Sequence, residues 1–237
     1  MPTSWSHYVG RCVDRLIIPL TPARNRLALH YRKHSVLGWE PESRWLGEYA
    51  PSGGIAVDAG ANIGLWTYAM ATSGLFRGVL AFEPNGELTG DLLSAKLPNV
   101  RVIQKALSSQ GGVRHLRVPM KNGVLLSGWA SLDKEQEVHW DDLQEILVET
   151  TRLDDEVAGH VSFLKIDVEG HELPVLDGAR RTVSSSRPVC LIECRKNTTD
   201  AVRRWFSELR VGYAPVNTRA RFGFGLSPGN VLFSTQD

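Results

Sequence analysis

Short apolar runs alternate with amphipathic stretches along most of this chain. A short apolar run bounded by turn residues is typical of a buried strand, whereas apolar residues at helical spacing predict a helix. On this basis we predict strands at 55–58, 78–83, 100–105, 161–167, 188–194, 211–217 and 230–235. Helices are predicted between them, at 63–73, 86–96, 171–185 and 199–209. Strands that alternate with helices favour an α/β fold with a parallel, doubly wound sheet.

The middle of the chain departs from this alternation. Residues 112–118 and 124–127 predict a hairpin at the edge of the sheet. Residues 128–146 are polar and predict a loop that contains a short helix. The glycine-rich stretch between the last two strands predicts another loop.

The first fifty residues have a different character. They are amphipathic and predict helices, which Pro19 and Pro22 interrupt. We therefore predict two parts, an N-terminal helical cap at 1–50 and a main domain at 51–237. The cap would cover the sheet or form part of a substrate or homodimer surface.

The bulk composition is that of an ordinary globular protein. Of the 237 residues, 42% are hydrophobic and 22% are charged, and the net charge of +1 gives no sign of nucleic-acid binding. No apolar run reaches the ~20 residues that span a bilayer, and the first residues lack the pattern of a secretory signal. Three cysteines, Cys12, Cys190 and Cys194, are too few for a disulfide framework. We therefore expect a cytoplasmic protein without a membrane span.

The stretch 55–64 combines a short strand with a turn of small residues. The strand ends on Asp58, and Gly60 and Gly64 follow in a D-x-G-x-x-x-G pattern. Such glycines let the backbone approach a ligand closely, at the strand ends where open α/β sheets bind ligands. A dinucleotide site has a glycine where Asp58 stands, because a carboxylate would repel the pyrophosphate. The acid instead suits a cationic or neutral ligand, such as the amino acid end of S-adenosylmethionine. The alternative is an ordinary turn between a strand and a helix.

A second acid stands at the end of the next predicted strand. Glu83 follows the glycine turn by roughly twenty residues, the distance at which α/β nucleotide folds place the acid that binds ribose. This spacing predicts that Glu83 accepts hydrogen bonds from the ribose hydroxyls of the same cofactor.

Ionisable residues also gather after the strand at 161–167. That strand ends on Asp167, His171 follows four residues later, and Glu193 ends the next strand. A hydroxyl is a poor nucleophile near neutral pH, so methyl transfer to oxygen needs a base. His171 is the predicted base, because a neutral imidazole accepts a proton at working pH. The alternative is a histidine that hydrogen-bonds to a carboxylate at a helix N-terminus. Lys165 is interpreted as a packing or salt-bridge residue.

Asp167 and Glu193 have two possible uses. They could face each other across the sheet edge and, with water, bind Mg²⁺, which would lower the pKa of a substrate hydroxyl. Alternatively, Asp167 orients the sulfonium cofactor, and both acids bind hydroxyl groups or arginines directly. Cys194, which follows Glu193, would be a poor ligand for Mg²⁺.

Aromatic residues beside polar groups are typical of sugar-binding surfaces. The predicted loop at 128–146 contains Trp129, His139 and Trp140, which are candidate residues for binding a glycan acceptor. The alternative is that the tryptophans fill the core beneath a long loop, because aromatic residues bury a large area.

These motifs resemble the FkbM family of S-adenosylmethionine-dependent methyltransferases. The resemblance covers about residues 50–235 and rests on 57–64 (VDAGANIG), 81–85 (AFEPN), 164–172 (LKIDVEGHE) and 176–179 (LDGA). It implies a class I methyltransferase fold, a Rossmann-like, mostly parallel sheet of seven strands whose last strand is antiparallel. Family members typically methylate hydroxyls of sugars, glycolipids or polyketides. Short stand-alone members resemble sugar O-methyltransferases of bacteria, including mycobacteria.

The resemblance also implies a set of cofactor contacts. Ordered from the methionine end of S-adenosylmethionine through the ribose to the adenine, they are Asp58, Gly60, Asn62, Gly64, Glu83, Ala106 and Leu107. The expected function is transfer of a methyl group to a sugar hydroxyl of an oligosaccharide, a polysaccharide precursor or a glycolipid. The alternatives are a methyltransferase for a polyketide, lipid or nitrogen acceptor, and a non-catalytic module that binds S-adenosylmethionine.

Overall fold

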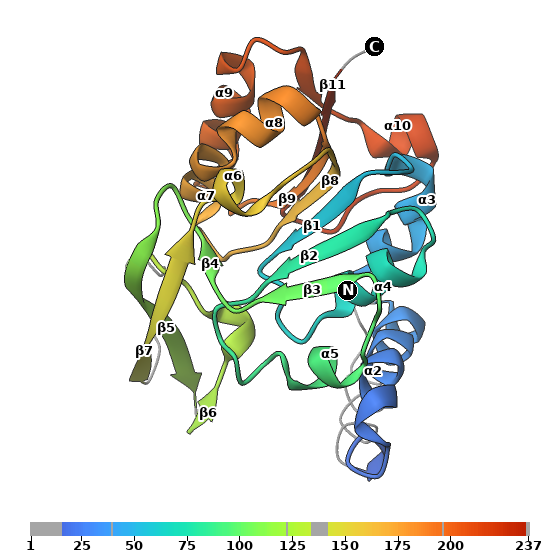
Figure 1. The fold of residues 1–237 in the computed structure, drawn as a ribbon. Coiled ribbons are helices and arrows are strands. Elements are labelled where there is room, and N and C mark those ends of the chain that lie inside the picture. Colours follow the sequence, from blue (N-terminus) through green and yellow to red (C-terminus); the bar gives the residue numbers. More distant parts are fainter. Residues whose placement is uncertain (1–15, 39, 122, 134–141, 196, 236–237) are drawn as a thin grey trace.

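The computed structural model describes residues 16–38, 40–121, 123–133, 142–195 and 197–235 (Figure 1). A sheet of seven strands forms its centre, in the order β10-β11-β9-β8-β1-β2-β3. The strands are β1 (Ile55–Ala59), β2 (Gly78–Phe82), β3 (Val100–Ile103), β8 (Val161–Ile166), β9 (Val189–Glu193), β10 (Tyr213–Pro215) and β11 (Asn230–Thr235). β11 runs antiparallel to both of its neighbours, β9 and β10, and the other neighbouring pairs in this sheet are parallel. The seven predicted strands and the class I, Rossmann-like topology are therefore confirmed.

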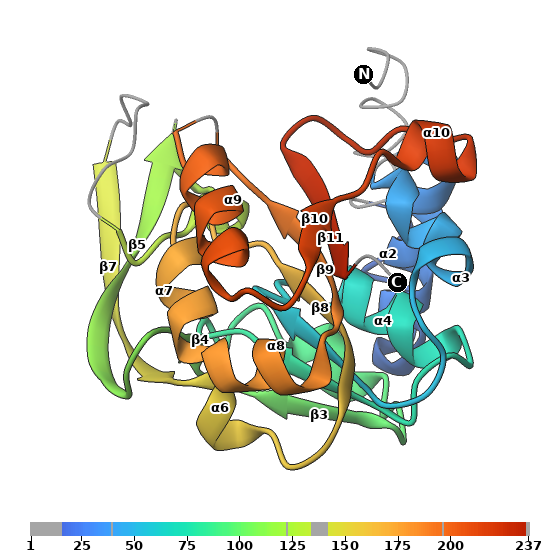
Figure 2. The ribbon, with the colours of Figure 1, turned by 90° about the horizontal axis from the view of Figure 1, so that it is seen from above.

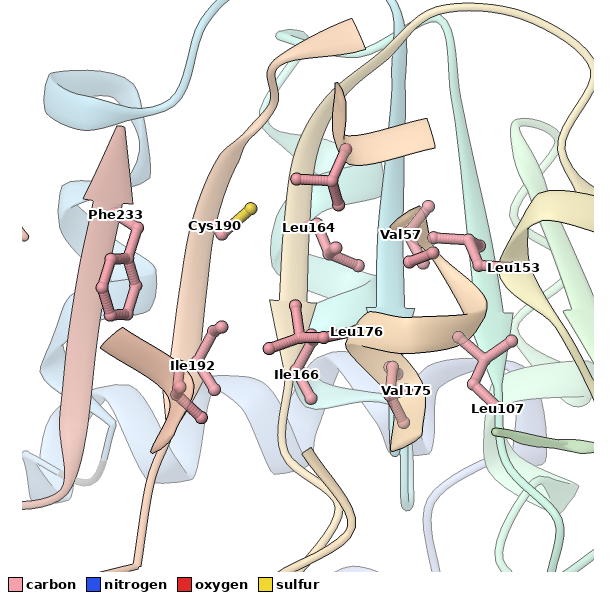
Figure 3. Close-up of a cluster of buried hydrophobic side chains, with 14 of the residues drawn as sticks. Val57, Leu107, Leu153, Leu164, Ile166, Val175, Leu176, Cys190, Ile192 and Phe233 are labelled. Carbon is pink, nitrogen blue, oxygen red and sulfur yellow. The ribbon is translucent and has the colours of Figure 1, made fainter. Parts of the chain in front are cut away.

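Helices cover both faces of this sheet (Figure 2). The helices on one face are α7 (Glu172–Gly178), α8 (Arg180–Ser186) and α9 (Thr199–Glu208). In Figure 3, Val175 and Leu176 of α7 lie against Leu164 and Ile166 of β8. The opposite face packs on α4 (Leu65–Thr72), where Trp66 shares a cluster with Phe163. Alternate residues of β8 thus enter different cores, as expected for a strand that is buried on both faces.

The predicted helix at 171–185 is two helices. α7 ends at Gly178, where an added Cβ would lie 2.0 Å from the carbonyl oxygen of Ser108. The buried carboxylate of Asp154 then accepts hydrogen bonds from the backbone N–H groups of Arg181 and Thr182, at 3.0 and 2.8 Å. A carboxylate at these free N–H groups stabilises a new helix start. Asp154 belongs to the short helix α6 (Leu153–Glu156), which the sequence did not predict.

A second sheet stands beside the carboxyl ends of the parallel strands (Figure 1). We call it the inserted sheet, with the order β4-β7-β5-β6. Its strands are β4 (Ala106–Leu107), β5 (Gly112–Lys121), β6 (Val124–Leu125) and β7 (Asp142–Thr151). The predicted hairpin forms between β5 and β6, but its predicted place at the edge of the main sheet is wrong, because it belongs to this second sheet. β5 pairs along most of its length with β7. The prediction of a loop at 128–146 is therefore wrong for residues 142–146, which belong to β7. The short helix predicted in this loop is η3 (Ser127–Trp129).

The N-terminal segment packs onto the main sheet. Its elements are α2 (Ala23–Leu37), η2 (Pro41–Trp45) and α3 (Leu46–Tyr49). Residues 18–20 form a turn and Pro22 is the N-cap of α2, so the predicted interruption of the helical stretch is present and a helix begins directly after Pro22. Leu46 and Tyr49 share the cluster of Phe163 and Trp66, so this end of the segment has no separate core. The domain boundary at residue 50 stays a prediction.

The remaining helices are short. α5 (Gly90–Ser94) follows β2 and contacts α2, and α10 (Thr218–Phe222) lies in the predicted glycine-rich loop. Within the described ranges, no helix combines the length and the apolar composition needed to cross a membrane.

Candidate cofactor site

The glycine turn after β1 is wedged between two neighbouring strand ends. Gly60 has a φ of +81°, and an added Cβ would lie 1.8 Å from the carbonyl oxygen of Asp167. The N–H groups of Gly60 and Ala61 both donate to the carbonyl oxygen of Phe82, at 3.0 and 2.9 Å. Only glycine has both the conformation and the space that this position requires. Gly64, with a φ of +93°, is the N-cap of α4.

Glu83 lies against this turn. Its side chain is buried and accepts hydrogen bonds from the backbone N–H groups of Asn62, at 2.8 Å, and Asn85, at 2.9 Å. Burial raises the pKa of Glu83 to about 7, although both hydrogen bonds act in the opposite direction. Glu83 is therefore a carboxyl group whose charge depends on pH near neutrality.

Asp58 is fully buried behind the turn. One carboxylate oxygen accepts a hydrogen bond from the Thr67 hydroxyl at 2.6 Å, and the other has no partner among the described residues. Burial raises the pKa of Asp58, and the nearby Lys165 opposes this shift. A buried oxygen without a partner is costly, so it is a candidate acceptor for a ligand N–H or O–H group.

Lys165 is a buried cation at the centre of these acids. Its Nζ lies 2.9 Å from Asp167 Oδ2 and 5.5 Å from the centre of the Trp66 ring. Burial alone would lower the pKa of Lys165, but Asp167, Asp58 and Glu40 together raise it. The interpretation of Lys165 as a salt-bridge residue is confirmed, and its partner is a predicted site residue. Residues two apart on a strand point to the same side, so the spacing of Lys165 and Asp167 in the sequence already indicated this ion pair.

The Mg²⁺ site expected at Asp167 and Glu193 does not fit these residues. The ammonium group of Lys165 already binds one oxygen of Asp167. Among the described residues, no three histidines, cysteines or acids are grouped as metal ligands. Loss of hydration and the Asp167 charge raise the pKa of Glu193 to about 8. Lys165 therefore supplies the positive charge that a metal ion would bring to this edge.

His171 is buried at the N-terminus of α7, with both ring nitrogens within hydrogen-bonding distance of a partner. Nδ1 lies 3.1 Å from Asp133 Oδ1, and Nε2 lies 3.0 Å from Ser108 Oγ. A general base needs an open nitrogen within reach of the substrate proton. The base role predicted for His171 therefore has no support in this arrangement.

A pocket extends from the glycine turn toward the inserted sheet. It has about 610 Å³ of space outside the protein atoms, part of it open to solvent. The predicted site residues that line it are Gly60, Asn62, Glu83, Ala106, Leu107, Asp167 and His171. Asp58, Gly64 and Glu193 are not in its lining. The pocket has a size typical of small-molecule sites.

The inserted sheet supplies one wall of this pocket. Leu116 of β5 lines it, together with Gly128, Ala130 and Leu132 from the segment after β6. Sequence analysis did not predict these residues, because no local motif marks them. Polar and apolar residues alternate around Leu116, which indicates a strand but not the ligand that it faces.

Of the three residues predicted to bind the methyl acceptor, the structure describes one. Trp129 is 49% exposed, and its neighbours Gly128 and Ala130 line the pocket. Trp129 therefore does not fill the core beneath a loop, which was the alternative interpretation. His139 and Trp140 lie outside the described residues.

Comparisons with known proteins agree with this geometry. A family model described as "Methyltransferase FkbM domain" matches residues 58–214. The chain is similar to the crystal structure of a methyltransferase FkbM from Methylobacillus flagellatus, with 19% identity and a TM-score of 0.52. That match covers 97% of this chain and 60% of the other, so the chain spans about three-fifths of the length of that relative.

Two further solved structures show weaker likeness. They are an rRNA methylase from Streptococcus thermophilus, with 15% identity and a TM-score of 0.47, and a Streptococcus mutans protein solved in complex with SAH, with 13% identity and a TM-score of 0.49. Each match covers 83% of this chain, and 95% and 97% of the other chains, respectively. No curated protein matches the chain significantly.

Proposed function

Because the chain belongs to the FkbM methyltransferase family, we propose that it transfers the methyl group of S-adenosylmethionine to a hydroxyl group of a glycan. The observation that carries this proposal is the pair of buried carboxylates, Asp58 and Glu83, on either side of the Gly60 turn. Asp58 lies outside the pocket lining, so its unpartnered oxygen can accept a hydrogen bond from the amino group of the cofactor only where that group enters behind the turn. Glu83 offers the remaining lone pairs of its carboxylate to the ribose hydroxyls.

The rest of the pocket suits the nucleoside. Ala106 and Leu107 of β4 form an apolar surface for the adenine, with Phe82 and Leu116 beside them. The predicted contacts of Gly60 and Asn62 with the cofactor fit this position, since both line the same pocket. Gly64 would act by setting the start of α4.

Asp167 and Glu193 are the groups that we assign to proton transfer. S-adenosylmethionine supplies an electrophilic methyl group. The acceptor oxygen forms a bond to that carbon as the carbon–sulfur bond breaks, and the hydroxyl proton passes to the Asp167–Glu193 pair. Asp167 lines the pocket and is held by Lys165. Glu193 lies outside the lining beside Asp167, and its pKa, raised to about 8, suits it to receive the proton from Asp167.

Transfer of a labelled methyl group to a panel of mono- and oligosaccharides tests this function. We expect label in at least one glycan, at a rate that is unchanged after treatment with a chelator, because Lys165 occupies the place of the metal. Label only in amines or lipids would contradict the glycan acceptor. Calorimetric binding of NAD without binding of S-adenosylmethionine or its demethylated product would contradict the whole proposal.

Cofactor binding should depend on pH through Glu83. The ribose hydroxyls donate to the carboxylate, so the ionised form binds, and its fraction in the free protein rises as pH increases through about 7. Between pH 6 and pH 8, we expect calorimetry to show about tenfold tighter binding of S-adenosylhomocysteine. In Glu83→Gln, binding should be about ten- to a hundredfold weaker at pH 8 and should no longer change with pH. A wild-type affinity that is constant from pH 6 to pH 8 would contradict this role.

Trp129 is the described candidate for the acceptor surface. If a sugar ring packs on its indole, Trp129→Ala should raise the acceptor KM about three- to tenfold, because such aromatic contacts contribute about 0.5–1.5 kcal/mol. The cofactor KM should not change. Trp45→Ala is the matched control, since Trp45 is 45% exposed and stacks on Phe224 away from the pocket lining. Steady-state kinetics with both substrates varied would measure this, and equal changes in both variants would contradict the assignment.

A further inference from the structure

Three side-chain contacts join the inserted sheet to the loop that leads into α7. The Ser131 hydroxyl donates to the carbonyl oxygen of Glu169 at 2.8 Å. His171 contacts Asp133 through Nδ1 and Ser108 through Nε2. Ser108 directly follows β4, and Asp133 lies beyond η3, so His171 links two separate parts of the insertion.

The chemistry of the partners defines the role of each ring nitrogen. An ionised Asp133 only accepts hydrogen bonds, so Nδ1 of His171 carries the hydrogen in this contact. In the neutral ring, Nε2 then accepts from the hydroxyl of Ser108. His171 is 1% exposed and Ser108 is fully buried, so water cannot readily replace these contacts. Removal of one partner would leave a buried polar group unsatisfied.

The residues held in this way form the pocket wall. Ala130 and Leu132 line the pocket, and they flank Ser131 immediately before Asp133. Ser131 also exchanges two backbone hydrogen bonds with Arg117 of β5, at 2.9 and 3.0 Å. The position of this wall therefore depends on contacts that converge on the loop at 169–171.

We propose that His171 is a positioning residue, which fixes the segment 130–133, beside β5 of the inserted sheet, as the wall of the nucleoside pocket. The inference rests on the proposed function only in naming the nucleoside as the ligand. His171 acts through Asp133 and Ser108, and it takes no proton from the acceptor. Asp133 lies beside the inserted sheet, and His171 lies between β8 of the main sheet and α7. The contact between them therefore aligns the two sheets.

Hydrogen exchange of the free protein tests the positioning role without any ligand. Asp133→Ala removes the partner of Nδ1 at a position whose side chain is 42% exposed, so the variant should fold. We expect the backbone amide of Ser131 to exchange about tenfold faster or more, as for loss of a hydrogen bond to a charged group. Asp133→Asn keeps an acceptor oxygen and should restore most of the protection.

The matched control is an ion pair between β7 of the inserted sheet and the link that joins β3 to β4. Glu149 of β7 lies 3.4 Å from Lys105, and both side chains are well exposed. Glu149→Ala should therefore leave the exchange of Ser131 unchanged, because surface pairs contribute little. Ser108→Ala, which removes the partner of Nε2, should accelerate this exchange as Asp133→Ala does.

Binding and kinetics provide the second measurement. Asp133→Ala and Ser108→Ala should weaken binding of S-adenosylhomocysteine about three- to tenfold and raise the cofactor KM more than they lower kcat. Unchanged exchange and unchanged affinity in both variants would overturn the proposal. So would a His171→Gln variant that loses kcat while exchange and affinity stay at wild-type values, because that result assigns His171 to the chemical step. Failure of the wild-type protein to bind S-adenosylhomocysteine would refute the proposed function, while exchange would still test the positioning role.

Discussion

Replacement of Gly60 by alanine should abolish cofactor binding and destabilise the fold. The new Cβ would lie 1.8 Å from the carbonyl oxygen of Asp167, which belongs to the backbone and cannot rotate away. The left-handed conformation of Gly60 adds a cost of about 1–2 kcal/mol for any other residue. With the strain of the displaced backbone, we expect a loss of about 2–5 kcal/mol in the free energy of unfolding.

Gly74→Ala separates the effect of conformation from that of the close approach. Gly74 has a φ of +73°, close to that of Gly60, but apart from its two chain neighbours no atom of the described residues lies within 4 Å of its added Cβ. This control should lose only about 1–2 kcal/mol and keep its affinity for S-adenosylhomocysteine. Urea unfolding and calorimetry of both variants would measure the difference. Wild-type affinity in Gly60→Ala would refute the assignment of this turn to the cofactor.

Lys165→Met should cost about 3–5 kcal/mol of stability at pH 8, since removal of one partner of a buried ion pair leaves uncompensated charge. Methionine approximates the length of lysine, so the change removes mainly the charge. Asp167 would lose its partner at 2.9 Å, and the buried Asp58 would lose the nearby charge that favours its ionised form. Lys105→Met is the control, because the Lys105 side chain is 37% exposed and such an exposed cation contributes at most about 1 kcal/mol through its ion pairs.

The pH dependence of this loss has a defined sign. The acids raise the pKa of Lys165, so its contribution is complete below the ordinary lysine pKa and persists until pH passes the raised value. Across pH 5–8, therefore, Lys165 keeps its charge, and within this cluster any change of charge comes from the acids. The raised pKa of Glu193, about 8, lets it take up a proton as pH falls, so the deficit of Lys165→Met should shrink between pH 8 and pH 5. Urea unfolding at both pH values would measure it, and a deficit that grows at pH 5 would contradict this account.

The sequence predicted the main sheet well because its strands are short, mainly apolar runs. The run that ends on Asp58 and the run that ends on Asp167 are buried on both faces, and this burial dictates their composition. The proximity of the acids at these strand ends was also predictable, because the carboxyl ends of parallel strands lie at one edge of the sheet.

The parts that the sequence did not predict depend on contacts between distant residues. The first half of β7 is almost entirely exposed, so a segment that reads as a loop becomes a strand only when β5 pairs with it. The division between α7 and α8 depends on Ser108 and Asp154, which are far from it in sequence. The partners of His171 come from the same inserted region, and no local pattern around His171 indicates them.

The position of β11 has a consequence for synthesis of the protein. This strand is the last of the main sheet to leave the ribosome, yet it lies between β9 and β10. Until residues 230–235 emerge, β9 exposes an unpaired apolar edge, and β10 has no partner within this sheet. Such edges pair readily with other chains. A nascent chain that stalls before β11 should therefore depend on chaperones, and enzymatic activity should appear only after translation of this strand.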